Sequence, residues 1–329
     1  MAERVLTYSS SKSFLTCQRK YNYRYVEQIE RLGPKSGALW YGEIWHNAME
    51  LWYKMFQMPF DERVQLVKEA IADWCHESSD LYIKMISAFM GYIKAFPTED
   101  FTPIWLEEEF KLPLIDPATG EQVVHCGDEW FLSGKVDGLV DVSGRDYLLE
   151  HKTKSHQIRL GDYTRDLDWD RQIHLYMWAI GKAQDREIHG CLYNIATKVI
   201  RKRKNKTKLD SMTESDAAYL KRYIEAYEAL QDDRLGSYFH REWLVYDQDC
   251  AEQELIEMAE IARRISSIDS GAKGGLWLKN KGACKNYGRR CQYMRLCKNP
   301  VDEGHIRETE YVSREAHSEL SAAVKTPLF

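Results

Sequence analysis

Hydrophobic residues along this 329-residue chain recur at two different spacings. Over 9–30, 37–57 and 61–96 they follow the three-to-four-residue spacing of amphipathic helices, and Pro97 is expected to end the last one. Other segments alternate, or are rich in β-branched and aromatic residues, which is typical of strands. The pattern predicts strands over 102–114, 130–142, 147–150, 187–200 and 242–246, and further helices over 166–182, 210–235 and 249–268.

A predicted hairpin in the middle of the chain carries the most informative residues. The strand over 130–142 and a turn at 143–146 would place Asp137 on one strand, and Glu150 and Lys152 at the end of the next. Buried carboxylates are costly unless their charge is compensated, and a divalent metal ion would do so. Such a group can hold the ion and activate water for phosphodiester cleavage. Glu-x-Lys triplets are nevertheless common, and most are solvated strand ends.

The helix predicted over 166–182 adds Gln172 and Tyr176, which are four residues apart and therefore share one face. An acid, then Glu-x-Lys, then a helix with Gln-x-x-x-Tyr is the order of motifs in the RecB-like branch of the PD-(D/E)xK nuclease superfamily. Residues 130–180 resemble that branch, which includes AddB-type and CRISPR-associated exonucleases. The resemblance implies that the catalytic group consists of Asp137, Glu150, Lys152, Gln172 and Tyr176.

The amino-terminal part extends the resemblance. The sequence Gly42-x-x-x-His46 matches a family motif that supplies a metal-binding histidine. Without the resemblance, a core or capping role for His46 on an aromatic helix would be favoured. With it, the implied ligands of Mg²⁺ or Mn²⁺ are His46, Asp137, Glu150 and the main-chain carbonyl of His151.

Eight cysteines occur, and three of them lie close together near the carboxyl end. No apolar signal peptide starts the chain, so a metal site is expected rather than a disulfide framework. Cys284, Cys291 and Cys297 leave a four-ligand site one short, and the resemblance of the amino-terminal segment 11–17 to the family segment that carries the first cysteine implies Cys17 as the fourth. Four thiolates suit a 4Fe–4S cluster or, as the less favoured alternative, zinc. The gap between Cys284 and Cys291 is longer than in relatives, which leaves the cluster type open.

Two further groups of charged residues have weaker assignments. The family often carries an acid before the hairpin, and Glu109 is a candidate, although a solvated strand face is the simpler interpretation. The basic run over 201–208 could follow phosphates or be merely solvated. Its candidate nucleic-acid contacts are Lys202, Arg203, Lys204 and Lys206.

Composition limits the remaining choices. The 44% apolar fraction is enough for a substantial core, and the formal net charge of −5 means that DNA binding would need a local basic surface. No apolar run reaches membrane-spanning length, so a soluble protein is expected. The resemblance implies an intracellular protein of prokaryotic or phage origin.

The resemblance implies an α/β fold with a PD-(D/E)xK core, in which helices flank a central mixed sheet. Helical additions and an iron–sulfur staple between the chain ends would complete it. Residues 1–300 are expected to form the nuclease domain, and 301–329 a peripheral tail. The expected function is metal-dependent DNA exonuclease activity on single strands or duplex ends, in DNA repair or recombination. A non-catalytic DNA- or partner-binding module and a structure-specific endonuclease are the alternatives.

Overall fold

The computed structural model describes most of the chain. The described residues are 1–33, 37–155, 160–199, 201–204, 214–228, 238–271, 275–286, 289–298, 301–315, 317–318 and 320.

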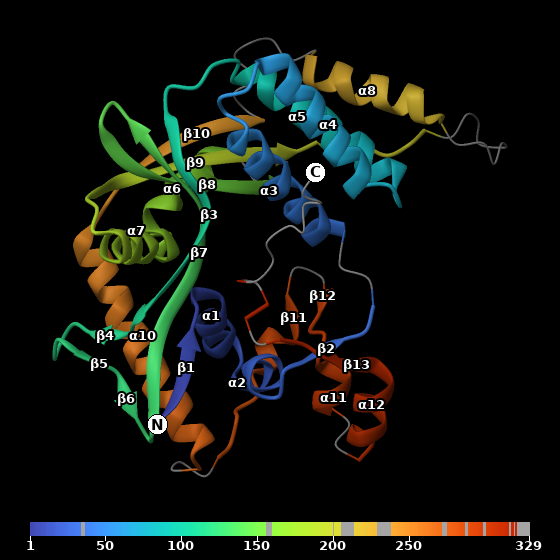
Figure 1. The fold of residues 1–329 in the computed structure, drawn as a ribbon. Helices are drawn as coiled ribbons and strands as arrows, with labels where there is room; N and C mark the ends of the chain where they lie inside the picture. Colours follow the sequence, from blue (N-terminus) through green and yellow to red (C-terminus); the bar gives the residue numbers. More distant parts are fainter. Residues whose placement is uncertain are drawn as a thin grey trace.

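A mixed sheet forms the centre of the fold (Figure 1). Its strands are β1 (Ala2–Leu6), β3 (Thr102–Pro113), β6 (Val124–His125), β7 (Asp128–Val142), β8 (Arg145–Ser155), β9 (Ile188–Lys198) and β10 (Phe239–Val245). They follow the order β1, β7, β8, β9, β10, and both β3 and β6 also pair with β7. The pairs β1–β7 and β8–β9 are parallel, whereas β7 runs antiparallel to β3, β6 and β8, and β9 to β10. The predicted central mixed sheet is confirmed.

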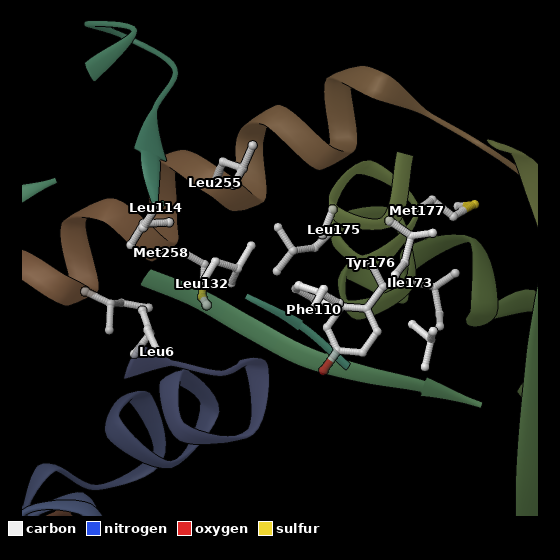
Figure 2. Packing of buried hydrophobic residues seen from close by; sticks show 14 of the residues in the cluster. Leu6, Phe110, Leu114, Leu132, Ile173, Leu175, Tyr176, Met177, Leu255 and Met258 are labelled. Atoms are coloured by element: carbon white, nitrogen blue, oxygen red, sulfur yellow. The ribbon is translucent and has the colours of Figure 1, made fainter. Parts of the chain in front are cut away.

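Helices cover both faces of this sheet. The helices of the described residues are α1 (Tyr8–Thr16), α2 (Gln18–Tyr21), α3 (Gly37–Lys54), α4 (Phe60–Trp74), α5 (Ser79–Ala95), α6 (Leu160–Arg165), α7 (Arg171–Gln184), α8 (Asp216–Glu228), α10 (Gln248–Asp269), α11 (Met294–Lys298) and α12 (Glu303–Glu310). One apolar layer packs α1, α7 and α10 against the sheet, and the other packs α3, α4, α5 and α8. Neighbouring residues of β8 serve opposite layers, Leu148 the first and Leu149 the second, as the alternation of a strand requires. Figure 2 shows the first layer, where Met258 of α10 lies beside Leu132 of β7.

Two predicted helices are interrupted. The stretch 61–96 is two helices, α4 and α5, because the Ser78 hydroxyl accepts a hydrogen bond from the Leu81 amide and starts a new helix. The stretch 9–30 breaks at Cys17, whose backbone is extended (φ −167°, ψ 112°). It then continues as α2 and a π-helical turn over Asn22–Val26.

A small carboxy-terminal lobe includes residues 301–315, which belong to the segment expected to be a peripheral tail. β13 (Tyr311–Ser313) pairs with β2 (Ile29–Arg31), and β11 (Lys285–Asn286) pairs with β12 (Arg289–Arg290). A separate apolar cluster holds the lobe together through Tyr23, Tyr293, Leu296, Ile306 and Tyr311. A further two-stranded pair, β4 (Ile115–Asp116) with β5 (Glu121–Gln122), lies after β3. No helix in the described part is long and apolar enough to cross a bilayer.

Candidate metal centre

The sheet opens between β7 and β8, and Asp137 lies at the opening. The antiparallel ladder of these strands ends at the pair Gly138–Leu149. The next amide of β8 that points toward β7, that of His151, donates to Asp137 Oδ2 at 2.6 Å instead of to the backbone. The carboxylate therefore stands where a ladder hydrogen bond would otherwise form. Its other oxygen, Oδ1, lies 3.1 Å from Nδ1 of His46 on α3.

Glu107 on β3 is a second acid at this centre, and the sequence analysis missed it. The register Leu106–Gly138 and Glu108–Val136 places Glu107 directly opposite Asp137. Facing carboxylates repel. Glu107 adopts a left-handed backbone (φ +54°), and its Oε2 lies 2.6 Å from Lys135 Nζ.

The alternative acid, Glu109, is exposed. The acids at 107–109 signalled a candidate, but the irregular register near Pro103 and Trp105 could not be seen in the sequence. In the described part of the chain, ligand atoms of His46, Glu107 and Asp137 all lie within 4.8 Å of one another. One histidine nitrogen and two carboxylates are donors that suit Mg²⁺ or Mn²⁺.

Glu150 and Lys152 form the other half of the centre. Glu150 is buried, and its Oε1 accepts from Lys152 Nζ at 2.5 Å. Burial lowers the pKa of Lys152, but Glu150, with smaller contributions from Asp170 and Asp137, raises it by more, so the ammonium remains charged. Asp170 also accepts a hydrogen bond from the Tyr193 hydroxyl (2.8 Å). Asp170 is thus a further acid near the lysine that the sequence analysis did not single out.

Burial also sets the ionisation of the acids. It raises the pKa of Glu150 to about 7, against the opposing effect of the ion pair, and raises that of Glu107 to about 7, reinforced by the charge of Asp137. Burial alone would raise the pKa of Asp137, but His46 and the neighbouring amide hold it well below its ordinary range. Burial lowers the pKa of His46, yet Asp137 outweighs this and the pKa reaches about 9. Such opposed shifts in one place are typical of functional sites.

The similarity of the chain to known proteins agrees with this geometry. The profile of the PD-(D/E)XK nuclease superfamily matches residues 5–298. The chain belongs to this superfamily. No curated protein sequence matches it. Members of this superfamily are nucleases that generally use divalent metal ions to cleave nucleic acid, and the chain is assigned to them.

The two predicted catalytic residues on α7 of this nuclease, Gln172 and Tyr176, have different surroundings. Gln172 lies in the first turn of the helix, where its backbone amide donates to Asp170 Oδ1 (3.2 Å). Tyr176 is buried in the apolar layer, with its ring edge-on to Phe110 at 5.3 Å (Figure 2). Gly134 leaves room for both rings, because a Cβ there would come within 2.6 Å of Phe110 and 2.9 Å of Tyr176.

The side chain of His151 is part of a buried polar network that the sequence did not reveal. Its ring stacks on Tyr53 (5.7 Å between centroids, 14° between planes), and its Nδ1 accepts from Asn194 Nδ2 at 3.2 Å. The same Asn194 nitrogen and Arg241 both contact the Tyr92 hydroxyl. Burial lowers the pKa of His151 to about 3, so the ring is neutral. The network fixes the backbone at residue 151, whose amide holds Asp137.

The four predicted cluster ligands of the nuclease line one pocket: Cys17, Cys284, Cys291 and Cys297. Hydrogen bonds bring the two distant segments together there. The Arg19 amide donates to the Leu278 carbonyl (3.0 Å), and the Asn280 amide points at Cys17 Sγ (3.4 Å). Cys75, Cys126, Cys191 and Cys250 are not among the residues that line this pocket.

The predicted basic run is only partly free to bind. Arg203 forms ion pairs with Asp80 (2.5 Å) and Asp216 (2.6 Å). It thereby bridges the first turns of α5 and α8. Lys202 and Lys204 are exposed. Lys206 lies outside the described residues.

The metal-free protein should lose stability through Glu150 and Glu107 as the pH rises from about 4.5 to about 7. Their folded-state pKa of about 7 exceeds the ordinary 4.5, so the folded state binds more protons in this interval. The stabilising contribution of these two protonated carboxyl groups to the folded state is complete below about pH 4.5 and is lost as the pH rises through about 7. Thermal unfolding in EDTA, compared between the parent and Glu150→Gln, measures it, because the amide does not titrate.

The stability difference between Glu150→Gln and the parent should therefore shift in favour of the variant between pH 5 and 8. Saturating Mg²⁺ should remove much of this shift in the parent, because metal replaces the protons. Glu109→Gln, at an exposed site on β3, is the matched control and should follow the parent. A Glu150→Gln difference that is constant with pH would contradict the assigned ionisation.

Proposed function

We propose that this chain is a RecB-like, Mg²⁺- or Mn²⁺-dependent DNA exonuclease that acts on single strands or duplex ends. One observation carries the proposal: ligand atoms of His46, Glu107 and Asp137 lie within 4.8 Å of one another, and Asp137 belongs to the same hairpin as the Glu150–Lys152 pair. A histidine on a helix facing this hairpin is what the resemblance to RecB-like nucleases implies. All the residues needed for cleavage are present, which favours an enzyme over a binding module.

The ion would be held by His46, Asp137, Glu107, Glu150 and the main-chain carbonyl of His151. When bound, it supplies a Lewis acid for the scissile phosphate and a water of lowered pKa. His46 must give up its proton to become a ligand, so metal binding should release protons.

Lys152 remains an ammonium at neutral pH because its pKa is raised. It therefore cannot act as the general base. Its role is to orient the attacking water and to stabilise negative charge that develops on the phosphate. Gln172 and Tyr176 would support this arrangement from α7, Tyr176 through packing. None of these groups is placed to read base edges, which fits cleavage without sequence specificity.

The four cysteines that line one pocket fit a 4Fe–4S cluster, with zinc as the less favoured occupant. The cluster would join the segment at Cys17 to the segment that follows α10, and so restrict the unfolded chain. Lys202 and Lys204 would add a non-specific hold on phosphates, whereas Arg203 already pairs with carboxylates.

The purified protein should degrade linear DNA with Mg²⁺ or Mn²⁺ and leave covalently closed circular single strands and duplexes intact. Asp137→Asn should lower the rate by about two to three decades, the usual loss for a group that stabilises the transition state. Gel analysis of end-labelled and circular substrates tests both points. Cleavage of circles at the linear rate would favour the endonuclease, and DNA binding with no cleavage would favour the binding module.

Glu107→Gln should raise the metal concentration needed for half-maximal cleavage by about tenfold or more, as loss of a charged partner at a metal site commonly does. Glu109→Gln on the same strand is the matched control, and its titration should follow the parent. Calorimetric titration with Mn²⁺ gives the affinity without relying on cleavage. Equal affinities of the two variants would remove Glu107 from the ligand set.

Cys17→Ser should abolish the visible absorption and the iron of protein purified without oxygen. It should also expose both chain ends to protease, because Cys17 lies more than 260 residues from Cys284 in sequence. Cys250→Ser, which changes a thiol outside the pocket, is the control and should keep the colour. Stoichiometric zinc without iron would keep the ligands and change the cofactor. Iron retained in Cys17→Ser would refute the ligand assignment.

A further inference from the structure

The segment around the carboxy-terminal cysteines is basic along its whole length and is not accounted for by the metal centre. Residues 276–298 contain no Asp or Glu, in a chain whose formal net charge is −5. A polyanion would be repelled by the molecule as a whole and would need such a local surface. The cations of this segment are Lys279, Lys281, Lys285, Arg289, Arg290, Arg295 and Lys298.

Some of these cations already have structural contacts. Arg295 pairs with Glu310, and Lys279 Nζ donates to the Cys297 carbonyl (2.8 Å). Lys285, Arg289 and Arg290 are exposed, and none of them makes an ion pair with any other described residue. These three residues form the β11–β12 hairpin together with Asn286.

The hairpin has a defined base. The Cys291 amide donates to the Cys284 carbonyl (2.9 Å), so the ladder begins at two of the four cysteines. The hairpin thus lies in the segment between these two cysteines. In the view of Figure 1, β11 and β12 extend from the lobe on its side toward α3.

The charge of the hairpin works against its own stability. Lys285 faces Arg290 directly across the two strands, and like charges in facing positions destabilise a strand pair. The strands are only two residues long, so there is little pairing to offset the repulsion. An anion bound between these side chains would relieve it.

We propose that the β11–β12 hairpin is a phosphate-binding element that contacts the sugar-phosphate backbone of the nucleic acid outside the metal centre. Lys285, Arg289 and Arg290 provide the contacts, and the cysteine pair at the base holds them in place. That the ligand is a nucleic acid rests on the proposed nuclease function. The hairpin would bind without sequence specificity, since phosphate contacts position a protein on nucleic acid without specifying bases.

The test compares two triple variants with the same change in charge. Lys285→Gln with Arg289→Gln and Arg290→Gln removes the hairpin cations. Lys94→Gln with Lys182→Gln and Lys221→Gln removes three exposed cations on α5, α7 and α8. Both are made in the full-length Asp137→Asn protein, so that DNA is bound and not degraded.

Binding of a fluorescein-labelled 20-nucleotide single strand is followed by anisotropy as a function of salt. Each phosphate contact adds about 0.7 to the log–log salt slope on single strands, so the hairpin variant should lose about 2. Its affinity at low salt should fall by about tenfold or more. The control variant should keep the parent slope. An unchanged slope in the hairpin variant, or an equal loss in both variants, overturns the proposal.

Three readouts distinguish phosphate binding by the hairpin from a role in the cysteine site and from a general affinity for acids. If the cations serve only to balance a cluster at the cysteines, the hairpin variant loses iron and keeps its salt slope, which overturns the proposal. If poly-glutamate displaces the DNA at equal charge concentration, the surface binds polyanions in general, which also overturns the proposal.

With Asp137 restored, hydrolysis of thymidine 5′-p-nitrophenyl phosphate should be unchanged in the hairpin variant. A parent that cleaves neither this ester nor DNA would refute the nuclease proposal while leaving the binding result interpretable.

Discussion

The centre depends on a fork in the sheet at which an aspartate side chain replaces a strand partner. Beyond Gly138 and Leu149, β7 stays with β1 and β3 while β8 stays with β9 (Figure 1). Asp137 fills the separation by accepting the His151 amide, which keeps a buried donor satisfied. Glu107, Asp137 and Glu150 consequently lie at one level across three strands. Three acids at one level repel one another unless cations lie beside them, which makes the place suited to a divalent ion.

The surrounding residues can be understood from this repulsion. His46 and Lys135 each compensate one of the acids, at 3.1 Å from Asp137 and 2.6 Å from Glu107. Lys152 does the same for Glu150. The unusual backbone of Glu107 is a local cost, and such strain persists where the surrounding structure enforces it, often at functional sites. A bound ion would take over part of the role of these cations and leave Lys152 available to the phosphate.

The parts of the site that could be predicted are those encoded by short spacings. Glu150 and Lys152 are two residues apart, and Gly42 and His46 are four apart, so strand and helix periodicity place each pair without knowledge of the rest. Glu107 depends on a register shift in β3, and Asp170 depends on the loop before α7. Both are set by tertiary packing. The break of the first predicted helix at Cys17 has the same origin, because the chain there is extended by its contacts with the segment that follows α10.

The distribution of charge connects the centre to the carboxy-terminal lobe. A metal centre built from three acids attracts a cation and repels the substrate phosphates until that cation is bound. Productive binding of a long polyanion therefore gains from contacts that do not depend on the metal, placed away from the acids. The hairpin at Lys285, Arg289 and Arg290 has this character, because its cations are unpaired among the described residues, whereas Arg203 in the more obvious basic run is committed to Asp80 and Asp216. A count of cations in the sequence favours the run over 201–208. Among the described residues of that run, however, Arg203 is already paired with two carboxylates, and this favours the hairpin as the phosphate-binding element.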